Sequence, residues 1–178
     1  ALPIWGIGND TLYGSFSSDA YQYQLGDGED VIIETQLNSE NTYPSLNDDG
    51  DSLVFGEGIT ADSLSFTRVG NDLVIGVADG DQVTVQNWFY PYAGAGEDLF
   101  KIDQLQFHDG EVLTFADVEN RVYYQGTNEA DSLFGYKDRN EIIDGRGGND
   151  YIDGSGGADV ILGGSGNDDL LGGAGKDI

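Results

Sequence analysis

The sequence predicts an all-β protein in which two runs of short repeats flank a small antiparallel β module. Three observations lead to this prediction. Acidic residues recur every nine positions through the C-terminal third, and a fainter copy of the pattern stands at the N-terminus. Glycine makes up 28 of the 178 residues, which is typical of a chain with many tight turns. Between the repeats, short runs of β-branched and aromatic residues are separated by turn signals.

The charge of the chain narrows its possible partners. Acidic residues number 33 against 7 basic ones, and the formal net charge is −26. This charge repels nucleic-acid backbones and anionic membranes, so we expect no nucleic-acid partner and no direct membrane insertion. Disordered acidic chains are poor in aromatic residues, whereas this chain is 11% aromatic. A halophile-type surface and a cation-binding protein are the two interpretations that remain.

The chain contains no cysteine and no methionine. No disulfide therefore holds the fold, and no thiolate binds a metal. Because the sequence starts at Ala1 and stops inside a repeat at Ile178, we expect it to be a fragment of a longer protein.

The C-terminal repeats keep a strict frame, with one extra residue inserted around Tyr136–Arg139. The acidic residues of the frame are Asp131, Glu141, Asp150, Asp159, Asp168 and Asp177. An aliphatic residue follows two positions later, and those expected to face inward are Ile143, Ile152, Ile161 and Leu170. At the N-terminus, the copies Gly6–Asp10 and Gly26–Asp30 fit the same pattern, and Asp19 stands between them.

These segments resemble the Gly-Gly-x-Gly-x-Asp-aliphatic nonapeptides of RTX (repeats-in-toxin) proteins, a family of Gram-negative exoproteins. The resemblance implies a parallel β-roll with two nonapeptides per coil, several bound Ca²⁺ ions, type I secretion, and a location outside the cell or on its surface. The domains we expect are an N-terminal roll remnant at 1–34, a linker at 35–50, an antiparallel capping module at 51–125 and a C-terminal roll at 126–178.

The repeat chemistry suits Ca²⁺, a hard cation that takes six to eight oxygen ligands at roughly 2.3–2.6 Å. With two repeats per coil, acidic residues two repeats apart stack, and we expect the pairs Asp131 with Asp150, Glu141 with Asp159, Asp150 with Asp168, and Asp159 with Asp177. The carbonyl ligands we expect are those of Arg146, Gly148, Ser155, Gly157, Gly164, Gly166, Gly173 and Gly175. The N-terminal candidates are Gly6, Gly8, Asp10, Gly26, Gly28 and Asp30.

The alternative to a metal site is a set of Asx-turns in which each aspartate bonds its own backbone. Stacked carboxylates without cations would repel one another, which disfavours this alternative for the C-terminal repeats. It stays open for the N-terminal copies, because Ser15–Ser18 replace glycines before Asp19. It also stays open for Glu141, whose turn carries Lys137–Arg139 where glycine belongs.

The middle segment has strand patterns of a different kind. The predicted strands are Ser52–Phe55, Ser63–Thr67, Asp72–Val77, Gln82–Trp88, Ile102–Phe107 and Glu111–Phe115. Asp79-Gly80 and Asp109-Gly110 indicate hairpin turns. Thr60 and Thr114 are predicted to cap short helices at 61–64 and 115–122. The segment looks like the domain that flanks the repeats in haemolysin-like RTX proteins, and we expect it to cap the N-terminal roll.

Few residues suggest other chemistry. His108 is the only histidine, so a zinc site or a histidine-based triad has too few parts, and we expect a solvated turn residue. We treat Glu97–Asp98 as a chance acidic pair and expect no enzyme active site in this segment. The aromatic run Trp88–Tyr92 either packs in the core or binds a glycan or peptide, as in an adhesin.

The leading hypothesis from the sequence is a calcium-gated folding module. At ten times the dissociation constant, each bound ion adds about 1.4 kcal/mol of stability by mass action. Four such ions add about 6 kcal/mol, which is comparable with the stability of a typical domain. The parent protein is left open, with a protease, a lipase and a toxin as the classes considered.

Overall fold

The computed structural model describes residues 6–14, 18–34, 50–89, 100–137 and 139–178. Almost the whole of the expected linker at 35–50 lies outside these residues. The chain forms two compact units: unit 1 comprises Ala1–Phe66 and Asn71–Val118, and unit 2 comprises Thr67–Gly70 and Glu119–Ile178. Their limits do not follow the expected domain boundaries, because most of the predicted capping module groups with the N-terminal repeats.

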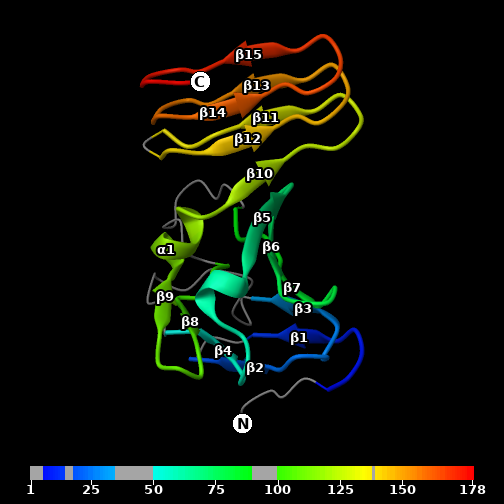
Figure 1. Cartoon of the computed structure of the whole chain (residues 1–178), viewed down its shortest axis with the longest axis vertical. Coiled ribbons are helices and arrows are strands. Elements are labelled where there is room, and N and C mark those ends of the chain that lie inside the picture. Colours follow the sequence, from blue (N-terminus) through cyan, green and yellow to red (C-terminus); the bar gives the residue numbers. More distant parts are fainter. Residues whose placement is uncertain (1–5, 15–17, 35–49, 90–99, 138) are drawn as a thin grey trace, which may run out of the picture. The chain divides into compact units, whose positions relative to one another are not determined.

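Unit 1 is built almost entirely from short β-strands (Figure 1). They are β1 (Thr11–Tyr13), β2 (Ala20–Tyr23), β3 (Glu29–Ile33), β4 (Ser52–Phe55), β6 (Asp72–Gly76), β7 (Gln82–Val85), β8 (Gln104–Gln106) and β9 (Val112–Thr114). A single 3-10 turn, η1, spans Ala61–Ser63. Strand β5 (Ser65–Val69) and helix α1 (Phe115–Glu119) each cross from one unit to the other.

Two parallel ladders and two antiparallel hairpins organise unit 1. One ladder runs β1-β3-β7 and the other runs β2-β4-β8, all in parallel register. Strands β6–β7 and β8–β9 form the two antiparallel hairpins that the sequence predicted. The topology differs from the expectation, because β4, β7 and β8 extend the N-terminal roll in parallel and do not form a separate antiparallel module.

The core of unit 1 is large and aromatic. Tyr21, Tyr23 and Phe55 are at most 1% exposed, and the Phe55 ring stacks on Phe107 with centroids 5.3 Å apart. Trp88 is also buried in this unit, after a turn at Asn87 whose φ of 60° ends β7 three residues before the predicted strand end. Burial of these large side chains contributes apolar stabilisation to unit 1.

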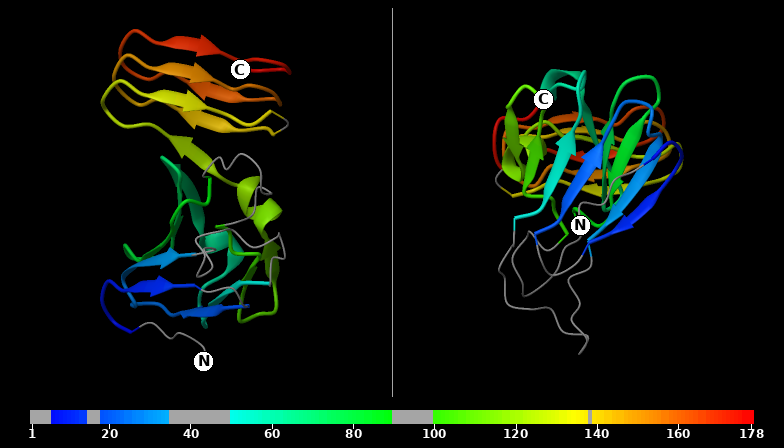
Figure 2. Two further views of the ribbon diagram at one scale, coloured as in Figure 1. Left: turned by 180° about the vertical axis from the view of Figure 1, so that it is seen from behind. Right: turned by 90° about the horizontal axis from the view of Figure 1, so that it is seen from below.

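Unit 2 is a parallel β-roll, as the repeats predicted. Its strands are β10 (Tyr123–Gln125), β11 (Ser132–Phe134), β12 (Ile142–Asp144), β13 (Tyr151–Asp153), β14 (Val160–Leu162) and β15 (Asp169–Leu171). Alternate strands pair, giving one parallel ladder β10-β12-β14 and another β11-β13-β15. Figure 2 shows strands β11 to β15, in yellow to red, stacked as successive coils. The roll begins before residue 126, because β10 already pairs with β12 and with Thr67 and Arg68 of β5.

The core of unit 2 is thin. Tyr124, Leu133, Ile143 and Ile152 form one buried cluster, and Ile161 packs against it. Leu170 was expected to join this stack, but it is 46% exposed. It lies in β15, the edge strand of the ladder β11-β13-β15.

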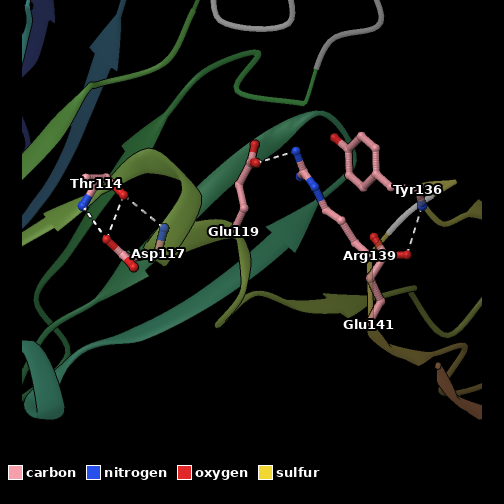
Figure 3. Close-up of polar contacts among 6 residues, drawn as sticks. All are labelled: Thr114, Asp117, Glu119, Tyr136, Arg139 and Glu141. Atoms are coloured by element: carbon pink, nitrogen blue, oxygen red, sulfur yellow. Dashed lines mark hydrogen bonds and ion pairs between the residues drawn. The ribbon is translucent and has the colours of Figure 1, made fainter. Parts of the chain in front are cut away.

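The predicted helix cap at Thr114 is confirmed. Its hydroxyl lies 3.3 Å from the amide nitrogen of Asp117, which donates to it, and the Asp117 carboxylate accepts from the Thr114 amide at 2.9 Å (Figure 3). Helix α1 ends at Glu119, three residues before the predicted end. None of the described helices is long and apolar enough to span a membrane.

Candidate metal site: the stacked turns

Acidic residues stand immediately before the strands of unit 2 and link one coil to the next. The amide of Glu141 donates to Asp159 Oδ1 at 2.9 Å, and the amide of Asp159 donates to Asp177 Oδ1 at 3.2 Å. The same bond joins Asp131 to Asp150 at 2.9 Å and Asp150 to Asp168 at 3.1 Å. The structure therefore brings together all four pairs that the repeat spacing predicted.

The second carboxylate oxygen of two of these residues has nothing to bond. Asp150 is 2% exposed and Asp159 is 0% exposed, and in each the Oδ2 atom is buried with no hydrogen-bond partner. Burial raises the pKa of the Asp159 carboxyl, and the nearby charge of Asp177 raises it further. A buried charged oxygen without a partner is strongly unfavourable, so these positions require a counter-charge.

Glycines before the turns leave room beside these oxygens. A Cβ atom added at Gly154 would lie 2.6 Å from Asp159 Oδ2 and 2.8 Å from the carbonyl oxygen of Gly172. At Gly126 it would lie 2.8 Å from both Asp131 Oδ2 and the carbonyl oxygen of Gly145. A carboxylate oxygen and a carbonyl oxygen of the following coil thus converge on the same place, where only glycine fits. An oxygen-lined space of this kind fits the donor set that Ca²⁺ prefers.

The predicted carbonyl ligands share one backbone feature: every one of the eight has a positive φ. Two of them are not glycine, Arg146 with a φ of 68° and Ser155 with a φ of 65°. Their carbonyls each accept an inter-coil hydrogen bond, from Ser165 at 2.8 Å and from Ala174 at 3.0 Å. The carbonyl oxygens of Gly148 and Gly157 point at the glycine stacked on each of them in the next coil. These left-handed turns expose backbone oxygens along the edge of the roll.

In the part of the chain that the structure describes, no three His, Cys, Asp or Glu side chains converge on a point that could hold a metal. Side chains alone therefore do not form a complete shell. One or two carboxylates with several backbone carbonyls, completed by water, do match the six to eight oxygens that Ca²⁺ takes. The residues present fit this ion, and the individual ligand assignments stay predictions.

In the first coil of unit 2, unlike the later coils, the second carboxylate oxygen of the acidic residue accepts hydrogen bonds. Asp131 Oδ2 accepts from the Thr127 amide at 2.6 Å and from its hydroxyl at 2.9 Å, which is the arrangement of an ordinary capping turn. The Tyr136 amide donates to Glu141 Oε2 at 2.8 Å. Burial raises the pKa of Glu141 to about 7, and the charge of Asp159 adds to the effect. In each residue one carboxylate oxygen, Asp131 Oδ2 or Glu141 Oε2, is thus already held by hydrogen bonds from the chain itself.

Two arginines lie at the first coil of unit 2, one of them, Arg139, where the repeat has glycine. Arg139 pairs with the buried carboxylate of Glu119 at 2.5 Å (Figure 3), and its guanidinium lies 4.4 Å from the centre of the Tyr136 ring. Arg68 lies 4.1 Å from the centre of the Tyr124 ring. Permanent cations therefore stand at the start of the roll, where the repeat pattern is broken.

The N-terminal copies form one stacked turn of the expected kind. The Asp10 amide donates to Asp30 Oδ1 at 2.8 Å, and Gly8 donates to the Asp27 carbonyl at 2.7 Å. Asp30 is 1% exposed, and its Oδ2 atom has no hydrogen-bond partner, like those of Asp150 and Asp159. Gly8 and Gly28 have positive φ, as do the carbonyl positions of the C-terminal turns. The Gly6 amide lies 3.3 Å from Asp10 Oδ2, and the Gly26 amide donates instead to Asp81.

Three acidic residues that the repeat period did not indicate continue the rows of coil-to-coil hydrogen bonds through the middle of the chain. Asp51, Asp81 and Asp103 immediately precede β4, β7 and β8. The Asp19 amide donates to Asp51 Oδ1 at 2.8 Å, and the Asp51 amide donates to Asp103 Oδ2 at 2.7 Å. Each of the three begins an Asp-x-aliphatic motif, as the repeat aspartates do, and this motif was the available signal. The long insertions between them hid the period.

Three other candidates lie among the described residues, and none of them lines a site there. His108 is an exposed turn residue, as predicted. Trp88 and Phe89 are 1% and 5% exposed, so these two side chains belong to the core and do not present a ligand-binding face. Tyr90–Tyr92 and Glu97–Asp98 lie outside the described residues.

Comparisons with known proteins match both kinds of segment. The family of RTX calcium-binding nonapeptide repeats matches residues 6–21, 136–170 and 144–178. The haemolysin-type calcium binding protein related domain matches residues 72–117. A curated relative, the iron-regulated protein FrpA of Neisseria meningitidis serogroup C, is 38% identical over 128 residues. The alignment covers 71% of this chain but 10% of that protein, so the chain spans about a tenth of its relative.

Proposed function

Because the chain carries RTX calcium-binding nonapeptide repeats, we propose that it is a calcium-gated folding module of a larger secreted protein. The observation that carries this proposal is the set of buried, unpartnered Oδ2 atoms at Asp30, Asp150 and Asp159. All three stand at the acidic position of a turn, two of them in the matched C-terminal repeats.

The small core of unit 2 favours a model in which folding depends on calcium over one in which calcium binds a unit that is already folded. Its buried core consists of four residues and one partly buried neighbour, and the whole chain carries a net charge of −26. Apolar burial of this size contributes little against the conformational entropy of ordering the chain. Calcium that binds the folded state alone adds stability at every site, and for such a coil this addition decides whether it folds.

Gating of this kind suits an exported chain. Extracellular calcium sites have dissociation constants of roughly 10⁻⁴–10⁻³ M, so they stay empty where free Ca²⁺ is scarce and fill outside the cell. We propose that the parent protein leaves the cell unfolded through a type I secretion system of a Gram-negative bacterium and that this module folds outside.

The test is a circular dichroism titration of the whole chain, beginning in EDTA. We expect the β signal of unit 2 to appear as Ca²⁺ is added through the millimolar range and to be absent with Mg²⁺ at the same ionic strength. Mg²⁺ is the control because it demands a tight octahedral shell and dehydrates reluctantly. A full β signal in EDTA that calcium leaves unchanged would contradict the proposal.

A further inference from the structure

We infer that Glu34 holds an additional calcium ion in unit 1, outside the nonapeptide repeats. The inference rests on the proposed function only for the identity of the cation. Glu34 follows β3 directly and lies between the segments that the two calcium-binding family descriptions match.

The carboxylate of Glu34 has the same property as the repeat aspartates. Glu34 is 3% exposed, its Oε1 atom accepts from the Tyr21 hydroxyl at 2.5 Å, and its Oε2 atom is buried with no hydrogen-bond partner. Among the described residues, four side-chain oxygens are buried in this way, and the other three belong to Asp30, Asp150 and Asp159. Glu34 is thus the one member of this set that no sequence pattern selected.

The backbone around Glu34 also matches the repeat turns. The amide of Gly14 donates to the carbonyl of Ile33 at 2.9 Å, as the amide of Gly154 donates to that of Leu171 at 2.8 Å. A Cβ added at Gly14 would overlap the Glu34 carboxylate, just as a Cβ at Gly154 would lie 2.6 Å from the unpartnered Asp159 Oδ2. In both places a glycine follows a strand and leaves room for a carboxylate oxygen. Glu34 therefore supplies at Gly14 what an aspartate supplies in the repeats.

The charges that face Glu34 are negative. Burial raises the pKa of Glu34 to about 8, and the charges of Asp51, Asp19 and Asp103 raise it further. Asp51 is itself only 3% exposed. Glu34 and Asp51 are thus two buried carboxylates whose charges repel, and a divalent cation relieves that repulsion.

A protonated Glu34 is the alternative, and the hydrogen bonds disfavour it. The proton of a neutral acid would sit either on Oε1, shared with the Tyr21 hydroxyl, or on Oε2. In both forms the buried Oε2 atom keeps no hydrogen-bond partner. A cation at Oε2 satisfies the atom in a way that a proton does not. Since no three carboxylates converge on one point among the described residues, backbone carbonyls and water would complete the shell.

The first test is the count of calcium ions bound per chain, measured by equilibrium dialysis and elemental analysis. Glu34→Gln keeps the size of the side chain and an acceptor for Tyr21 but removes the charge. We expect this variant to bind one ion fewer than the wild type while the repeats keep theirs. The exposed Glu57→Gln serves as the matched control and should bind as many ions as the wild type.

The outcomes separate this inference from the proposed function. A Glu34→Gln chain that keeps every ion and only gains stability in EDTA would show a buried neutral acid and overturn the inference. A wild-type chain that binds no calcium would overturn the proposed function itself. If Glu34→Gln does not fold, wild-type crystals grown with Ca²⁺ decide the question: an anomalous peak beside Glu34 Oε2 supports the site, and its absence there beside occupied repeat turns rejects it.

Discussion

Both units carry rows of acidic residues that bond from coil to coil, but the number of residues between successive members differs greatly. In unit 2 the linked residues are 18 positions apart from Glu141 to Asp159 and 19 from Asp131 to Asp150. In unit 1 the steps are 20 from Asp10 to Asp30, 32 from Asp19 to Asp51, and 52 from Asp51 to Asp103. The row is thus a property of the parallel coil, in which the amide of each acidic residue donates to the carboxylate of the acidic residue in the following coil. The nonapeptide repeat is the most compact form of this coil.

The cores of the two units differ in size, and the unit with the irregular spacing has the larger core. Unit 1 buries large aromatic side chains, including Tyr21, Phe55 and Trp88, whereas unit 2 buries a single stack. Insertions in unit 1 cost little loop entropy, since that entropy grows only slowly with length, and they add apolar area. We therefore expect unit 1 to depend less on calcium than unit 2. The four predictions that follow test this difference, from the largest expected effect to the smallest.

The largest effect is expected from Asp159→Ala in unit 2. The change removes the acceptor for the Glu141 amide and the buried oxygen that faces the ion. The losses are about 1 kcal/mol for the hydrogen bond and about 1.4 kcal/mol for the ion at ten times its dissociation constant. Urea unfolding in saturating Ca²⁺ measures the sum, with the exposed Asp169→Ala as control. Asp30→Ala in unit 1 should cost less of that unit's stability; an equal proportional loss in both units would contradict the comparison.

Arg139→Ala is expected to destabilise the first coil of unit 2 in the calcium-loaded protein. The change removes the guanidinium that pairs with the Glu119 carboxylate, whose side chain is 2% exposed. Losing a hydrogen bond to a charged group costs about 1.5–3 kcal/mol. Thermal melts in saturating Ca²⁺ should show this loss, while the exposed Lys176→Ala should show none. A melting temperature equal to that of the wild type would show that this ion pair does not stabilise the coil.

Gly166→Ala is expected to weaken calcium binding and to destabilise unit 2 by about 1–2 kcal/mol, the cost of a left-handed backbone for a residue with a side chain. Gly166 has a φ of 137°, and an added Cβ would collide with the carbonyl of Gly148. Gly147→Ala is the matched control in the same stack, because its nearest neighbour is the hydroxyl oxygen of Ser165 at 3.2 Å, which can rotate away. Denaturant midpoints in Ca²⁺ compare the two. Equal midpoints would show that the turn tolerates a side chain at both positions.

The smallest effect is a pH dependence of the calcium-free protein. The pKa of Glu141 rises from 4.5 to about 7 in the folded state, so its contribution to stability is present below about pH 4.5 and is lost as the pH rises through 7. In EDTA, residual structure around β12 should therefore be greater at pH 5 than at pH 8. Glu141→Gln should flatten this dependence, whereas the exposed Glu129→Gln should retain it. Two-dimensional NMR of the β12 amides provides the measurement, and a flat wild-type profile would rule the effect out.

The regular part of the fold was predictable because its acidic and aliphatic residues recur at a fixed spacing. The frame from Asp150 to Asp177 predicted which residues stack, and the cap at Thr114 followed from local chemistry. The parallel continuation through β4, β7 and β8 was not predictable from a period, since the insertions change the spacing while strand patterns alone do not specify partners. The role of Glu34 was hidden for another reason: a lone glutamate after a strand has no pattern, and only its burial reveals it.

The most direct test of calcium gating is hydrogen exchange of the whole chain, resolved by segment, in EDTA and in saturating Ca²⁺. We expect amides of 151–162 in unit 2 to exchange freely in EDTA and to gain protection of several orders of magnitude in Ca²⁺. Amides of 53–55 and 83–85 in unit 1 should already be partly protected in EDTA. Strong protection of 151–162 without calcium, unchanged by its addition, would contradict calcium gating.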